Sequence, residues 1–289
     1  MGEKDMAEKN LEAWDDVFAD IVNVLLFKGK RLVKEQDLEA DTKDSIFKAD
    51  GNLHEQERDV SKFWKNGEIR ISILGFENQT KEDLNMPLRV ISYDGASYKQ
   101  ELLDKKLKQK YPVTTLVLYF GTDSKWTSPK RLSDCFNIPE ELKPFVNDYK
   151  INVFDIAWLE DETINMFQSD FKFVAQYFQA KRKNEKYVPT NEEIIHVDSV
   201  FKMFKALTGD NRFETVYNQF IKENKKGGVS MEKIIDDFIN KGIEKGAQQK
   251  AEETARNALT LKLLPEQVTQ ITGLPLEKVL ELQKSIVIK

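Results

Sequence analysis

The sequence predicts an α/β (α+β) fold whose first half mixes strands with helices and whose C-terminal region is all helical. Short apolar segments rich in β-branched residues, which are typical of buried strands, occur before Trp158. After Trp158, apolar residues recur every three or four positions, as they do on one face of a helix. A chain of 289 residues is long enough for one large domain or two ordinary ones. We therefore expect a boundary near 158–160.

The elements of the first half follow from local patterns. Apolar residues from Leu11 onward repeat at helical spacing until Gly29, which is a helix-ending residue. The predicted elements, in chain order, are a helix over about 11–27, strands over 45–48, 60–64 and 68–79, a helix over 86 to about 108, and strands over 112–120 and 151–156. Asp94-Gly95 could interrupt the second helix.

The sequence after Trp158 predicts helices and no strands. They are expected near 160–183, 192–208, 211–225, 229–257, 264–272 and 275–285. The last two flank Gly273-Leu274-Pro275 and suggest a small helix-turn-helix-like end. We therefore expect three parts: a core over 1–158, a helical region over 159–228 packed on or following it, and a tail over 229–289.

The amino-acid composition limits the kinds of site and the classes of protein that this chain could represent. With two histidines and the single Cys135, one chain cannot build a structural zinc site from Cys and His, so a metal would have to sit on carboxylates. Neither His54 nor His196 has a partner at catalytic spacing, and both are expected in surface or loop roles. The strongest apolar run, Val113–Phe120, is far shorter than the roughly 20 residues that span a bilayer. No apolar leader is apparent, so we expect a cytoplasmic protein. The net charge of −5 counts mildly against nucleic acid as a partner.

Three oxygen-bearing side chains could form a metal site. Glu77 and Gln79 are two apart on a predicted strand and would project from one face, about 6.5–7 Å apart. Asp59, on the neighbouring strand, could add a third ligand for a hard cation such as Mg²⁺. Alternatively, the strand leaves the core at Gly75 and these side chains are simply solvated.

The register of the hairpin decides whether these side chains can meet. A two-residue loop of Asn66-Gly67 would set Asp59 opposite Leu74, on the wrong face. A three-residue loop with Gly67 in the left-handed conformation would set Asp59 opposite Ile73, on the face of Glu77. We predict the three-residue loop.

Three motifs resemble a known family. They are Arg58-Asp-Val-Ser-Lys-Phe63, Gly75-Phe-Glu-Asn-Gln-Thr80 and Met86-x-x-Arg89-x-x-x-Tyr93. Together, over about 11–210, they resemble PD-(D/E)XK nuclease family transposases, which are related to bacterial recombination-promoting nucleases (the Rpn family). The resemblance implies a restriction-endonuclease-like αβββαβ core within 1–158. It also implies DNA endonuclease activity with Mg²⁺ or another divalent cation, acting in recombination or transposition of mobile elements.

The resemblance also implies roles for single residues. Asp59 and Glu77 would be the metal ligands, and Asp16, preferred over Asp15, would be the accessory acid on the first helix. Gln79 stands where the family motif has a catalytic lysine, and it brings no charge.

Two readings therefore stay open. The first is an active endonuclease, and the second is a catalytically weak or inactive DNA-binding or scaffold protein that keeps the fold. Arg89 or Lys62 could supply the missing cation, and with Tyr93 they are the candidates for DNA contact. The partner expected is DNA rather than a membrane, and cleavage of both strands with one site per chain suggests a homodimer.

Overall fold

A computed structural model of the chain describes residues 11–40, 45–49, 52–56, 60–74, 81–105, 109–185, 187, 192–208, 215, 218, 229–230 and 248–287. The chain divides into two compact units, Met1–Met231 and Glu232–Lys289. No helix within the described ranges is long and apolar enough to cross a membrane.

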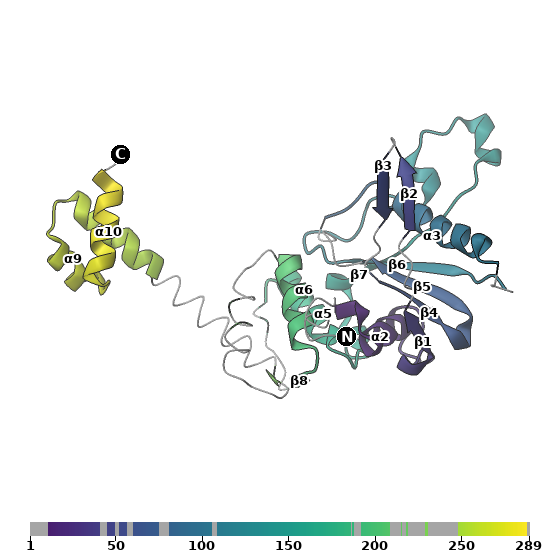
Figure 1. The fold of residues 1–289 in the computed structure, drawn as a ribbon, viewed down its shortest axis with the longest axis horizontal. Coiled ribbons are helices and arrows are strands. Elements are labelled where there is room, and N and C mark those ends of the chain that lie inside the picture. Colours follow the sequence, from purple (N-terminus) through teal and green to yellow (C-terminus); the bar gives the residue numbers. More distant parts are fainter. Residues whose placement is uncertain are drawn as a thin grey trace. The chain divides into compact units, whose positions relative to one another are not determined.

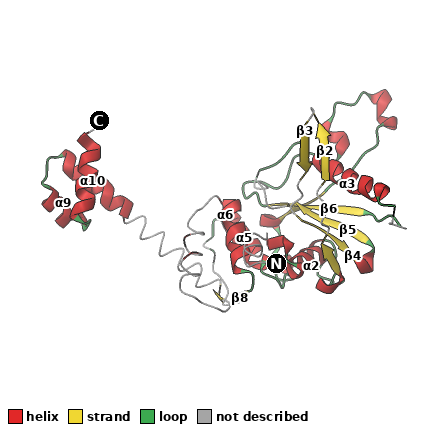
Figure 2. Ribbon diagram, in the orientation of Figure 1, coloured by secondary structure: helices red, strands yellow, loops and turns green. Residues whose placement is uncertain are grey.

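The first unit is built on a five-stranded mixed sheet in the order β1-β4-β5-β6-β7 (Figures 1 and 2). Its strands are β1 (Leu38–Ala40), β4 (Val60–Trp64), β5 (Ile69–Leu74), β6 (Val113–Tyr119) and β7 (Asn152–Asp155). β1, β4 and β5 pair antiparallel, whereas β5, β6 and β7 run parallel. A separate hairpin joins β2 (Ser45–Ala49) to β3 (Asn52–Gln56). The mixed α/β class is thereby confirmed, although β1 and β3 were not predicted.

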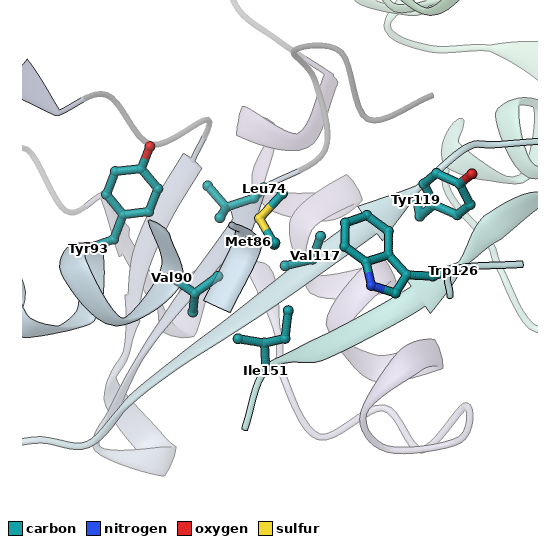
Figure 3. Close-up of a cluster of buried hydrophobic side chains, with 8 residues drawn as sticks. All are labelled: Leu74, Met86, Val90, Tyr93, Val117, Tyr119, Trp126 and Ile151. Atoms are coloured by element: carbon teal, nitrogen blue, oxygen red, sulfur yellow. The ribbon is translucent and has the colours of Figure 1, made fainter. Parts of the chain in front are cut away.

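Two helices cover opposite faces of this sheet. Helix α2 (Asp15–Leu25) lies on the face of Lys62, whose ammonium is 5.3 Å from the ring centroid of Phe18. Helix α3 (Met86–Leu103) lies on the other face, where Leu74 joins the buried cluster shown in Figure 3. Lys62 pairs directly with Ile71, so it shares the face of Ile71, and Leu74 points the opposite way.

Helix α3 passes through Asp94-Gly95 without a break. The carboxylate of Asp94 is buried and accepts hydrogen bonds from Thr115 Oγ1, at 2.6 Å, and from the Tyr149 hydroxyl. These partners satisfy the carboxylate that would otherwise disfavour a helix interior. The interruption that the sequence allowed does not occur.

The hairpin between β4 and β5 has a different register from the predicted one. Trp64 pairs with Ile69, and Val60 pairs with Ile73, so the three-residue loop was wrong. The left-handed residue is Glu68, with φ 47°, and not Gly67. Gly67 is needed for another reason: a Cβ there would lie 2.1 Å from Cε3 of Trp64, whose indole covers the turn.

The helical part of the first unit packs against the sheet. Its helices are α4 (Asp161–Ile164), α5 (Phe171–Lys183) and α6 (Val197–Thr208). Phe178 of α5 packs on Phe120, just after β6, with ring centroids 5.1 Å apart. Two short strands, β8 (Glu193–Ile194) and β9 (Val229–Ser230), pair where helix was expected. The helix predicted over 211–225 lies almost entirely outside the described residues.

The described part of the second unit consists of helices. Residues 248–260 are helical and are followed by α9 (Pro265–Thr272) and α10 (Leu276–Val287). Gly273 ends α9 in the left-handed conformation, with φ 72°. The core is small and apolar, and includes Ala255, Leu259, Val268, Val279 and Leu282. The two last helices predicted from the sequence are confirmed.

Candidate functional site

The segments that contain the predicted metal ligands attach to one edge of the five-stranded sheet. β5, β6 and β7 are parallel and so end at the same edge, and β4, antiparallel to β5, begins there. Val60, the first residue of β4, pairs with Ile73 near the end of β5. The chain enters this edge from Asp59 and leaves it after Leu74 toward Glu77. Asp59, Glu77 and Gln79 themselves lie outside the described residues.

The observed register removes one argument for the predicted metal site. A common face for Asp59 and Glu77 required Asp59 opposite Ile73, but Ile73 pairs with Val60. Strand alternation therefore does not supply a common face for Asp59 and Glu77. The strand order shows only that both segments attach to the same edge of the sheet.

On both sides of the segment that contains Glu77 and Gln79, described residues are held by the sheet or by hydrogen bonds. On one side β5 ends at the buried Leu74. On the other, the Glu82 carboxylate accepts backbone hydrogen bonds from Thr127 at 3.0 Å and Ser128 at 2.5 Å, in the loop after β6. Burial raises the pKa of Glu82, but these hydrogen bonds outweigh it and hold that pKa below its ordinary value. The described residues on either side of 75–80 are therefore tied to this edge.

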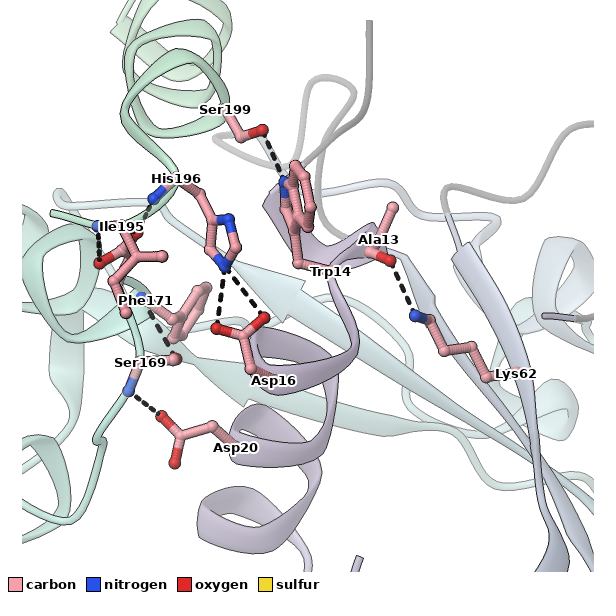
Figure 4. Close-up of polar contacts among 11 residues, drawn as sticks. Ala13, Trp14, Asp16, Asp20, Lys62, Ser169, Phe171, Ile195, His196 and Ser199 are labelled. Atoms are coloured by element: carbon pink, nitrogen blue, oxygen red, sulfur yellow. Dashed lines mark hydrogen bonds and ion pairs between the residues drawn. The ribbon is translucent and has the colours of Figure 1, made fainter. Parts of the chain in front are cut away.

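Lys62, the third residue of β4, is a buried cation. Its side chain is 4% exposed, and Nζ donates a 2.7 Å hydrogen bond to the Ala13 carbonyl (Figure 4) and pairs with Asp15. An ammonium removed from water needs such partners, because desolvating it alone costs several kcal/mol. Lys62 was a candidate for surface contact with DNA, and the structure instead buries it under the first turn of α2.

Asp16 turns away from the sheet toward the helical part of the first unit. Nε2 of His196 lies 3.0 and 2.8 Å from its two carboxylate oxygens (Figure 4). Burial raises the pKa of Asp16, but the hydrogen bond and the charge of His196 outweigh it and hold that pKa below the ordinary value. The neighbouring Asp15 is 51% exposed and faces Lys62.

His196 lies in the loop before α6, as the sequence predicted, but it also has a partner in Asp16 that the sequence did not reveal. The histidine side chain is 11% exposed and stacks on Trp14, with ring centroids 4.2 Å apart and planes 18° apart. Trp14 Nε1 in turn donates to Ser199 Oγ at 2.8 Å. No spacing rule could have found the contact with Asp16, because the two residues are 180 positions apart.

Two buried carboxylates complete the connection between α2 and the helical part. Asp170 accepts hydrogen bonds from the amides of Ile195, at 3.1 Å, and His196, at 2.6 Å. Asp20 accepts from the amides of Gln168 and Ser169, each at 2.8 Å; Figure 4 shows the bond from Ser169. Burial is the largest influence on Asp170 and raises its pKa, against these hydrogen bonds.

Arg89 and Tyr93 occupy one side of α3 but differ in exposure. Arg89 is 44% exposed and pairs with Asp83 at 3.1 Å. Burial lowers the pKa of Arg89, but Tyr93 and Asp83 raise it above the ordinary value. Tyr93 is 7% exposed and belongs to the core cluster of Figure 3. Arg89 therefore keeps an accessible charge in the first turn of α3, whereas Tyr93 is mainly a packing residue.

Within the described ranges, no group of three or more His, Cys, Asp or Glu side chains could hold a metal ion. A family model described as "Putative transposase, YhgA-like" matches residues 50–208, which is more than half of the chain. The matched range begins after α2 and includes Asp59, Glu77, Arg89 and His196. No curated protein and no solved structure matches the chain.

Proposed function

Because the chain belongs to the YhgA-like transposase family, we propose that it is a metal-dependent DNA endonuclease that hydrolyses phosphodiester bonds in recombination or transposition. The observation that carries the proposal is the shared sheet edge. The segments bearing Asp59 and Glu77 attach to β4 and β5 at that edge, where Val60 pairs with Ile73.

The order of elements supports a PD-(D/E)XK core. Helix α2 is followed by β1, β4 and β5, then by α3 and β6, which is an αβββαβ order with the β2–β3 hairpin inserted after the first strand. A mixed sheet with a helix on each face can present loops from one edge to a substrate. In this proposal, Asp59 and Glu77 meet beyond the last paired residues.

The donor set suits a hard divalent cation. Two carboxylates and an amide oxygen are oxygen ligands of the kind that Mg²⁺ prefers. When bound, such an ion lowers the pKa of a coordinated water and polarises the scissile phosphate. Asp59 and Glu77 would hold the ion, and the Gln79 amide would orient the attacking water.

Of the two candidate cations, Arg89 is the accessible one that could replace the charge that Gln79 lacks. Its guanidinium is 44% exposed and steadied by Asp83, so it can reach a phosphate at a small cost in side-chain entropy. Lys62 is buried and already holds Asp15. We therefore assign phosphate contact to Arg89.

The accessory acid is better placed at Asp15 than at Asp16. Lys62 reaches Asp15 from β4, whose first residue directly follows Asp59. Asp16 is held by His196 on the other side of the helix. Asp15 is also half exposed, so its carboxylate remains open to water.

Nicking of supercoiled plasmid with Mg²⁺ tests the proposal. We expect Asp59→Ala and Glu77→Ala each to lower the rate by about 100-fold or more. Glu140→Ala removes an exposed carboxylate, 81% accessible, whose partner is Lys143, and is the matched control. Full cleavage by both site variants would overturn the residue assignment. A wild-type chain that cleaves nothing but binds DNA in a salt-dependent manner would overturn the enzyme and favour the scaffold reading.

A further inference from the structure

We infer that His196 is a positioning residue for this proposed active site, holding the first turn of helix α2 in place. The inference rests on the proposed function, because the turn it holds carries Asp15. His196 itself is not placed at the reacting atoms. Its effect passes through Asp16 and the helix backbone.

The contact between His196 and Asp16 is closely defined. Nε2 reaches both carboxylate oxygens, at 3.0 and 2.8 Å, and the imidazole lies flat on Trp14 (Figure 4). The stack fixes the plane of the ring, and the hydrogen bonds fix its direction. With 11% of the side chain exposed, His196 has little room for another rotamer.

The backbone of His196 is held as well. Asp170, which is 2% exposed and precedes α5, accepts hydrogen bonds from the amides of Ile195 and His196. Among the described residues, Asp170 at the start of α5 and Asp16 on α2 are thus carboxylates that contact this histidine. A continuous series of contacts therefore runs from α5, through the segment before α6, to the start of α2.

The first turn of α2 depends on such contacts. The N-cap residue of this helix, Trp14, makes no capping hydrogen bond with its side chain. Lys62 holds the turn from the sheet side, through the Ala13 carbonyl and Asp15. His196 holds it from the opposite side through Asp16. Removing one support lets the turn shift, and a displacement of about 1 Å in a catalytic group can lower turnover by about 100-fold.

A positioning role and a purely structural role predict different measurements. A structural histidine would lower the melting temperature while leaving the turnover of folded molecules unchanged. A positioning histidine lowers kcat while the KM for DNA stays near the wild-type value, because the proposed phosphate contact is Arg89 on α3. A side chain that restores the hydrogen bond to Asp16 would restore kcat.

The test compares His196→Ala and His196→Gln in plasmid nicking with Mg²⁺ below the melting temperature of each variant. We expect His196→Ala to lower kcat about tenfold or more, with KM changed less than about twofold, and His196→Gln to recover most of the loss through its amide donor. Lys172→Ala, which breaks the ion pair between Lys172 of α5 and Glu192 in the segment before His196, is the matched control. Unchanged kcat in His196→Ala, or equally low kcat in the Gln variant, would overturn the inference.

Amide hydrogen exchange separates this inference from the proposed function. We expect the amides of residues 15–19 to exchange faster in His196→Ala and at the wild-type rate in Lys172→Ala. Unchanged exchange overturns the positioning role whether or not the chain cleaves DNA. Faster exchange in a chain whose wild type cleaves nothing overturns the proposed function, and with it the catalytic purpose of the contact.

Discussion

The ammonium of Lys62, 4% exposed, and the carboxylate of Asp15, 51% exposed, form an ion pair at the first turn of α2. The two partners differ in how much water each has lost. The buried ammonium depends on the pair, whereas the half-exposed carboxylate can be solvated without it.

Two substitutions of Lys62 should therefore distinguish the effect of its charge on stability from the effect of its packed side-chain stem. We expect Lys62→Ala to lower the free energy of unfolding by about 2–4 kcal/mol, because it removes a buried stem and leaves a cavity above Phe18. Lys62→Met keeps most of that volume and should cost less than about 1.5 kcal/mol. Urea unfolding measures both. Equal losses would show that the charge, and not the stem, supports the fold.

The two glycines at positions 67 and 95 should respond in opposite directions to alanine. Gly95 lies inside α3 with nothing within 4 Å of an added Cβ, so Gly95→Ala should stabilise by about 0.5–1 kcal/mol. Gly67→Ala forces the indole of Trp64 off the turn and should destabilise by about 1 kcal/mol or more. Thermal unfolding of both variants checks this, and a stabilising Gly67→Ala would contradict the turn geometry.

Acidification should weaken the contact between α2 and the helical part. The pKa of Asp16 is lowered in the folded state, so its contribution is present above the unfolded pKa, about 3.9, and is lost as pH falls through the lower folded value. Asp16→Asn cannot ionise and should therefore show a flatter dependence of stability on pH below about 5. Urea unfolding at several pH values between about 3 and 6 measures the slope. Identical slopes in the two proteins would contradict the assigned shift.

Arg89 should matter to catalysis more than an arginine of similar exposure elsewhere. If it contacts the scissile phosphate, Arg89→Ala should lower the nicking rate by about 10- to 1000-fold, and Arg89→Lys should lose less because it keeps the charge. Arg131→Ala is the control, since Arg131 is 55% exposed and pairs with Asp148 much as Arg89 pairs with Asp83. Equal nicking rates in Arg89→Ala and Arg131→Ala would show that Arg89 does not contact the scissile phosphate.

Elements whose pattern is local were predictable. The strand over Val60–Trp64 and the helix starting at Met86 both appear where the spacing of apolar residues placed them. The register between β4 and β5 was not, since it depends on which loop residue adopts the left-handed conformation. Glycine is the usual residue there, but the indole of Trp64 covers Gly67, and Glu68 takes that conformation instead.

The chain's own pattern of residues determined its class, most of its helices and strands, and the family motifs around Asp59, Glu77 and Arg89. Only the tertiary structure decided that Lys62 is buried and that His196 contacts Asp16. Periodicity reports which residues leave water, and it is a short-range property of the chain. A contact between residues 180 positions apart is instead decided by how the sheet and its covering helices pack.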